Sequence, residues 1–199
     1  MILFLSGHTY KYESEKVCRI FFPTEKILFA EADEAFPPEE TKRVYTARRI
    51  ENGTVVYACT AEIDGKTASY EVAETPAYAE LIEENALAVA MVRALSQITG
   101  VTPPWGILTG VRPSKLMRKL IAEKGEAGAV AAFRNELMVS PAKTALCLSV
   151  AKAENEAIAL SAPNSYSLYV SIPFCPTRCA YCSFVSHSIA QAKKLVPDY

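Results

Sequence analysis

The sequence predicts an α+β fold for the N-terminal region, in which an antiparallel sheet with covering helices leads into a helical subdomain, followed by the start of an α/β domain. Short β-branched and aromatic runs fill residues 1–73, helical periodicity replaces them from Pro76, and a strand pattern returns after a linker at residues 161–165. We therefore expect three parts. They are a sheet-and-helix domain at 1–100, a helical subdomain with its linker at 101–164, and a separate C-terminal part at 165–199.

The first part contains six expected strands, at residues 2–5, 16–22, 26–30, 43–50, 54–63 and 66–72. Asn52-Gly53 and Asp64-Gly65 separate the last three runs. Both central positions of a two-residue hairpin turn need positive φ, which Asn, Asp and Gly adopt most readily. The last three strands are therefore predicted to form an antiparallel meander.

Helical periodicity runs from Thr75-Pro76 to Gly100, where glycine ends it. Three further helices are expected at residues 113–124, 127–138 and 141–160. Ser140-Pro141 gives the last of these an N-cap serine and a proline at the first helical position. The first helix is expected to cover the sheet, and the other three to form the helical subdomain.

Composition narrows the class of protein. The chain has 199 residues, 21 Lys and Arg against 22 Asp and Glu, and a net charge of −1. Such a balance argues against nucleic-acid binding by bulk positive charge. The longest apolar run, from Ala86 to Val92, is far shorter than the roughly 18 residues of a membrane-spanning helix. The N-terminus also lacks the basic start of a signal peptide. We expect a cytoplasmic protein with no membrane partner.

Cysteine spacing points to a metal site. Three of the six cysteines are scattered in apolar patterns and are expected to be buried as small hydrophobic residues: Cys18, Cys59 and Cys147. The other three form a C-x3-C-x2-C motif: Cys175, Cys179 and Cys182. Closely spaced thiols in a reducing compartment are typical metal or cluster ligands. Three ligands leave a metal with an open position, which favours chemistry over a purely structural role.

The sequence around this motif, Tyr-Val-Ser-Ile-Pro-Phe-Cys-Pro-Thr-Arg-Cys-Ala-Tyr-Cys-Ser-Phe at 169–184, resembles the radical S-adenosylmethionine enzymes. A buried strand at 167–172 that leads into the cysteine loop is similar to the oxygen-independent coproporphyrinogen-III oxidase (coproporphyrinogen dehydrogenase) family. The stretch at 105–113, Trp-Gly-Ile-Leu-Thr-Gly-Val-Arg-Pro, resembles a branch of that family with a long N-terminal extension.

The resemblance implies a cofactor and a reaction. Cys175, Cys179 and Cys182 would hold three irons of a [4Fe–4S] cluster, and S-adenosylmethionine would chelate the fourth. Tyr169 and Tyr181 match positions that contact this cofactor. The family uses the resulting radical for oxidative decarboxylation of coproporphyrinogen-III propionates in porphyrin and haem biosynthesis, so the expected partners are a porphyrinogen substrate and an electron donor protein. No catalytic residue can be assigned.

Two features depart from the family pattern, in which a histidine usually stands at Ser171 and a further cysteine at Phe184. A relative that binds haem or acts on another substrate is therefore the alternative within this class. The partial barrel of a radical S-adenosylmethionine enzyme needs about 200 residues, whereas the third part covers only 165–199. We expect this chain to be the N-terminal part of a longer enzyme that is active only at full length.

Other interpretations remain open for several residues. The three cysteines could form a structural zinc site completed by His187, in a small module that binds a protein partner or RNA. Tyr169 and Tyr181 could be packing residues. Trp105 could anchor its loop or contact a partner. Four basic residues on one helix face could hold an anion at the helix N-terminus, or could form a solvated face: Arg112, Lys115, Arg118 and Lys119.

Overall fold

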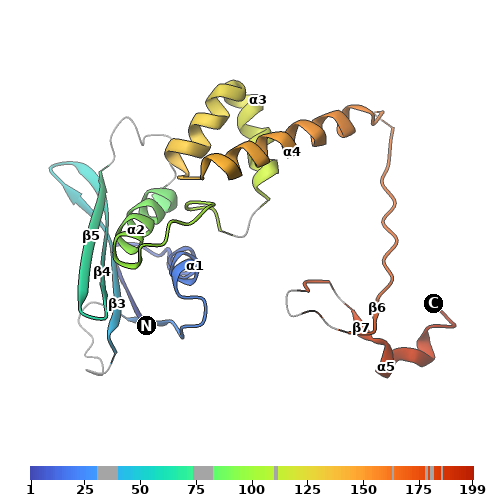
Figure 1. The fold of residues 1–199 in the computed structure, drawn as a ribbon, viewed down its shortest axis with the longest axis horizontal. Helices are drawn as coiled ribbons and strands as arrows, with labels where there is room; N and C mark the ends of the chain where they lie inside the picture. The colour runs from blue at the N-terminus through green and yellow to red at the C-terminus, as the bar shows by residue number, and fades with distance from the viewer. Residues whose placement is uncertain are drawn as a thin grey trace. The chain divides into compact units, whose positions relative to one another are not determined.

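The structure is a computed structural model of residues 1–199, and it describes all of them except 31–39, 74–82, 110, 111, 163, 178, 180, 181 and 185. The chain forms two compact units, Met1–Ile158 and Ala159–Tyr199 (Figure 1). The helical segments between residues 113 and 158 lie in the same unit as the sheet. The predicted domain boundaries stay predictions. The expected helix start at Thr75-Pro76 lies outside the described residues.

A five-stranded sheet in the order β2-β1-β3-β4-β5 is the framework of the first unit. Its strands are β1 Ile2–Ser6, β2 Leu28–Ala30, β3 Lys42–Glu51, β4 Thr54–Ile63 and β5 Lys66–Ala73. The last three form the antiparallel meander that the turn residues predicted. Asn52 and Gly53 have φ angles of 51° and 81°, and Asp64 and Gly65 have 50° and 81°. The two hairpin predictions are confirmed.

The prediction of a strand at residues 16–22 is wrong, because this segment lies almost wholly in helix α1, Lys11–Phe21. Ser14, Val17 and Cys18 are buried at helical spacing, and the Arg19 guanidinium lies 2.6 Å from a Glu15 carboxylate oxygen one turn earlier. The helix connects β1 to β2, which run parallel, and β1 is also parallel to β3. The sheet is therefore mixed and not purely antiparallel, since a helical crossover brings the chain back in the same direction.

Helices α1 and α2 cover one face of this sheet (Figure 1). Helix α2, Glu83–Thr99, packs on β4 and β5, and α1 packs against α2. Nine side chains of α2 are buried, an extent typical of a helix that lies in the core: Ala86, Leu87, Ala88, Val89, Ala90, Met91, Val92, Ala94 and Leu95. As predicted, the helix ends before Gly100. Among the described residues, no helix is long and apolar enough to cross a membrane.

The helical segments that follow are α3 Pro113–Ala131, a π-helical turn at Ala132–Glu136 and α4 Pro141–Ala159. Gly125, at φ 73°, breaks α3 between the two helices that the sequence predicted there. The loop before α3 packs closely against the residues that follow the π-helical turn. At Gly106, in this loop, an added Cβ would lie 2.0 Å from the Leu137 carbonyl oxygen. The next residue, Ile107, donates its N–H to that carbonyl at 3.1 Å.

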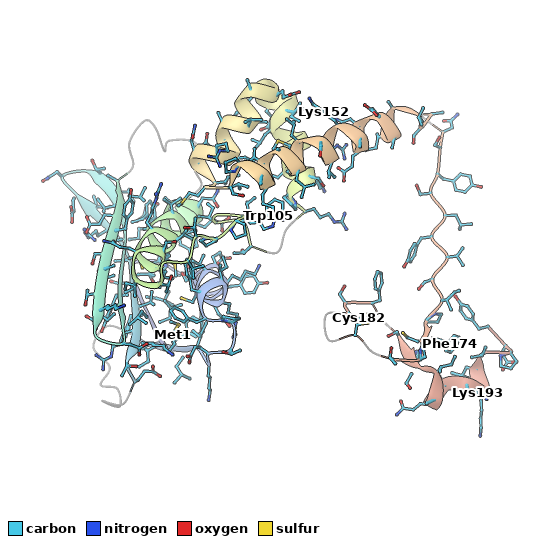
Figure 2. All side chains as sticks on the ribbon, viewed as in Figure 1. Met1, Trp105, Lys152, Phe174, Cys182 and Lys193 are labelled. Carbon is cyan, nitrogen blue, oxygen red and sulfur yellow. The ribbon has the colours of Figure 1, made fainter. Side chains whose placement is uncertain are left out.

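The structure bears on two of the open interpretations, those of Trp105 and Arg118. Trp105 is half-buried against the core (Figure 2). The Lys143 ammonium lies 5.4 Å from the centre of its ring. This contact favours the loop anchor. The Arg118 Nε donates to Asn155 Oδ1 at 2.8 Å and its Nη1 lies 3.7 Å from Glu154 Oε2, so Arg118 links α3 to α4. A packing role therefore explains Arg118 without an anion.

Candidate metal centre

The cysteine loop of the second unit is closed by a short parallel ladder. Strand β6, Phe174–Cys175, pairs with β7, His187–Ser188, and the His187 N–H donates to the Pro173 carbonyl at 2.7 Å. A four-residue helix, α5 Ile189–Ala192, follows directly. Residues 176–186 thus form a loop whose two ends are hydrogen-bonded to each other.

The C-terminal residue supports the base of this loop. The Tyr199 hydroxyl donates to the Ser171 carbonyl, and the Tyr199 ring meets the Phe174 ring edge-on, with centroids 5.5 Å apart and an interplanar angle of 87°. These contacts hold β6 at Phe174, the residue directly before the first cysteine, Cys175. Figure 2 labels Phe174 and Cys182 in this unit.

The three predicted ligands all lie on this loop or at its base. Cys175 ends β6 and is half-buried, Cys179 is exposed, and Cys182 is half-buried. The Cys182 N–H donates to the Cys179 carbonyl at 3.1 Å, so these two residues share one turn. Within the described part of the chain, no three His, Cys, Asp or Glu side chains are gathered closely enough to hold a metal ion. The ligand assignment of the three cysteines therefore stays a prediction.

A hollow of about 260 Å³ lies beside Cys175. Its wall consists mainly of polar side chains from the two ends of the loop and from α5: Cys175, Pro176, Thr177, Ser186, His187, Ser188 and Gln191. Among these, only Cys175 and His187 were singled out from the sequence. The rest carry no local signal, because parallel pairing between residues more than ten positions apart leaves no short-range pattern.

The strand predicted at residues 167–172 is wrong for the structure as described. The segment is not a strand, and its apolar side chains Leu168, Tyr169, Val170 and Ile172 are 71–80% exposed. A strand needs a neighbour to satisfy its backbone and to cover its apolar side chains, and the described residues supply none here. Tyr169 is 75% exposed, and Tyr181 lies outside the described residues, so both cofactor contacts stay predictions.

The remaining cysteines are structural. Cys18, Cys59 and Cys147 are buried, as predicted. Burial raises the pKa of the Cys18 thiol to about 12 and that of the Cys147 thiol to about 11, and it raises the pKa of Cys59 as well. A thiol that stays protonated is neither a nucleophile nor a metal ligand. Of the six cysteines, the three on the loop are the ones that are exposed or half-buried.

The loop fits an iron–sulfur cluster by the chemistry of its donors. Thiolates are the soft ligands that hold such clusters, and both ends of the loop that carries them are fixed. Cys175 would bind from the base of the loop, and Cys179 and Cys182 from its turn.

One curated protein shows clear similarity to this chain. It is the oxygen-independent coproporphyrinogen-III oxidase-like protein HemZ of Bacillus subtilis (strain 168), 34% identical over 113 residues, an alignment that covers 53% of this chain and 22% of HemZ. The chain thus matches about a fifth of the length of that relative. No family model matches the sequence, and no solved structure matches it. The similarity supports a relationship with the oxygen-independent coproporphyrinogen-III oxidase-like proteins.

Proposed function

We propose that this chain is the N-terminal part of a radical S-adenosylmethionine oxidoreductase that decarboxylates propionate groups of coproporphyrinogen III in porphyrin and haem biosynthesis. The observation that carries the proposal is the placement of three thiols, Cys175, Cys179 and Cys182, on one loop with joined ends. The similarity to an oxidase-like protein supports the same reaction class.

The chain's own residues would hold and orient the cofactor. The three thiolates would bind three irons of a [4Fe–4S] cluster, and Tyr169 and Tyr181 would contact S-adenosylmethionine. When bound, the cluster and S-adenosylmethionine together supply a 5′-deoxyadenosyl radical that removes a hydrogen atom from a substrate propionate. The Phe174 and Tyr199 contacts would keep Cys175 in place while the loop takes up the cluster.

Reconstitution tests the ligand set. We expect the full chain, incubated without oxygen with iron and sulfide, to gain a broad visible absorption that dithionite bleaches. Alanine variants of Cys175, Cys179 and Cys182 should each lose it. Cys147→Ala is the matched control, because this thiol is buried in the other unit and should leave iron binding unchanged. Loop variants that keep the absorption and the iron would contradict the proposal.

The substrate is tested with a longer protein that contains this chain, since the chain matches only 22% of its relative. Anaerobic incubation with coproporphyrinogen III, S-adenosylmethionine and a reducing system should release carbon dioxide and form vinyl groups. We place this reaction in the cytoplasm, with electrons delivered by a donor protein. Binding of haem without turnover would instead assign the protein to the non-oxidase relatives.

One observation favours a second candidate, a zinc module that binds a partner. His187 lines the same hollow as Cys175, so an imidazole is available near the first thiol. A Cys3His set binds zinc as a closed tetrahedral site. Protein purified without oxygen would then contain one zinc and no iron. Loss of that zinc in His187→Ala would establish the module, whereas an unchanged iron content in this variant supports the cluster.

A further inference from the structure

Residues 166–172 form an extended stretch between α4 and β6 in the chain (Figure 1). Within the described part of the chain, neither of the two sheets includes this stretch. Its five apolar side chains are 71–89% exposed: Tyr166, Leu168, Tyr169, Val170 and Ile172. An unpaired stretch of this kind is a template for pairing with another chain, because its backbone offers N–H and C=O groups next to apolar side chains.

The sequence of this stretch, Tyr-Ser-Leu-Tyr-Val-Ser-Ile, is symmetric in character about Tyr169. When two copies run antiparallel with residue 169 opposite itself, Leu168 lies opposite Val170 and Ser167 lies opposite Ser171. The aromatic first residue then meets the β-branched last residue. Aromatic pairs, aromatic pairs with a β-branched residue and hydroxyl pairs are contacts that stabilise antiparallel strands. The stretch carries no charge, so identical copies do not repel each other.

A contact of Ser171 shows which edge of the stretch is open. The Tyr199 hydroxyl donates to the Ser171 carbonyl, so the edge that carries this carbonyl is partly occupied. In antiparallel strands the backbone groups of successive residues point to opposite edges. Leu168 and Val170 therefore present their N–H and C=O groups at the other edge. Pairing of Leu168 with Val170 uses this open edge, and the contact with Tyr199 opposes the addition of a third copy.

We propose that two copies of this chain form a symmetric dimer by antiparallel pairing of residues 166–172, with Tyr169 opposite the partner's Tyr169. Each copy presents the same patch, so the interface is closed by a two-fold axis. A two-stranded sheet is only marginally stable by itself, so dilution should separate the copies and expose the stretch again. The dimer needs no metal and no cysteine, so it is tested separately from the proposed function.

Sedimentation equilibrium of the full metal-free chain measures this assembly. We expect the average molar mass to rise with concentration from the 21.8 kDa of one chain toward twice that value and no further. Tyr169→Lys and Tyr169→Glu each place like charges directly opposite each other at the two-fold axis, so each variant alone should stay monomeric. An equimolar mixture of the two variants should form dimers again, because opposite charges then face each other at position 169.

Leu160→Lys is the matched control, because this side chain is 88% exposed but lies outside the stretch, so the variant should dimerise like the unchanged chain. Tyr169 is itself 75% exposed, so its substitutions disturb no packed core. An unchanged chain that stays monomeric at every concentration would overturn the proposal, and so would growth beyond a dimer. Dimers of Tyr169→Lys alone, a mixture that stays monomeric, or an equal loss of dimers in Leu160→Lys would each overturn it as well.

Discussion

His8 and Thr46 form a hydrogen bond that determines which nitrogen of the imidazole carries the proton. His8 Nε2 lies 3.1 Å from Thr46 Oγ1, and the Thr46 hydroxyl donates its only proton to the Phe4 carbonyl at 2.8 Å. Nε2 must therefore be the donor. On the other side of the ring, the Tyr10 N–H donates to His8 Nδ1 at 3.3 Å, so Nδ1 is unprotonated and the histidine is neutral.

This arrangement predicts that the free energy of unfolding depends on pH through His8. Burial lowers the pKa of His8 below its ordinary value of 6.5. Below about pH 6.5 the unfolded chain binds more protons at this residue than the folded chain, so stability falls as the pH falls through that range. Urea unfolding of the full chain between pH 7.5 and 5 should show this loss, and His8→Gln should show a smaller one. His187→Gln, in the exposed part of the other unit, is the control. An unchanged slope in His8→Gln would contradict the prediction.

Gly106 predicts a strong effect of a single methyl group. At φ 58° an alanine is strained, and its Cβ would also lie 2.0 Å from the Leu137 carbonyl oxygen. Gly65 has φ 81° with no atom within 4 Å of its Cβ position, so Gly65→Ala isolates the conformational cost of about 1–2 kcal/mol. In denaturant unfolding, Gly106→Ala should lose clearly more stability than Gly65→Ala. Equal losses would show that the backbone at Leu137 moves away without cost.

Tyr10 should titrate differently when its acceptor is changed. The Tyr10 hydroxyl donates to Glu83 Oε2 at 2.7 Å, and this hydrogen bond, together with the negative charge of Glu83, raises the pKa of Tyr10 to about 12. Glu83→Gln removes the charge and should bring the pKa back toward 10. Ring-labelled tyrosine followed by NMR measures this shift, with Tyr10→Phe to assign the signal. A pKa that stays near 12 in Glu83→Gln would show that Glu83 is not its cause.

The boundary between the units predicts where a protease cuts first. Tyr166, Leu168 and Tyr169 are 75–89% exposed and follow the end of α4, whereas the first unit buries its core between the sheet and the helices. Limited chymotrypsin digestion of the metal-free chain should cleave at these three residues and leave an N-terminal fragment of roughly 160 residues. Mass spectrometry of the fragments checks this. First cuts inside Met1–Ile158 would contradict the boundary.

Local chemistry explains which parts of the fold could be predicted. The Asn-Gly and Asp-Gly turns dictate their own φ angles, so β4 was predicted at its observed bounds, Thr54–Ile63. The segment 16–22 misled because Val17, Ile20 and Phe21 favour strands, and only the 3.6-residue spacing of its buried side chains, with the Glu15–Arg19 pair, indicates a helix. The parallel order of β1, β2 and β3 depends on that helix, so it was missed as well.

The candidate site divides in the same way. Cys175, Cys179 and Cys182 could be found because their spacing lies within one short stretch. Ser188 could not, since its place opposite Cys175 depends on pairing across the whole loop. The His8 network likewise joins residues almost forty positions apart. Contacts of this kind leave no pattern in a window of neighbouring residues.

The ladder between β6 and β7 holds the cysteine loop as a closed ring before metal binds, as in a macrocyclic chelator. An open chain loses much conformational entropy when distant donors are brought together around a metal, and this cost grows with the length of the loop to be closed. Here the pairing of Cys175 with Ser188 closes the ring before any metal arrives. Metal uptake then has to order only the interior of the ring, so part of the entropic cost of chelation is met during folding.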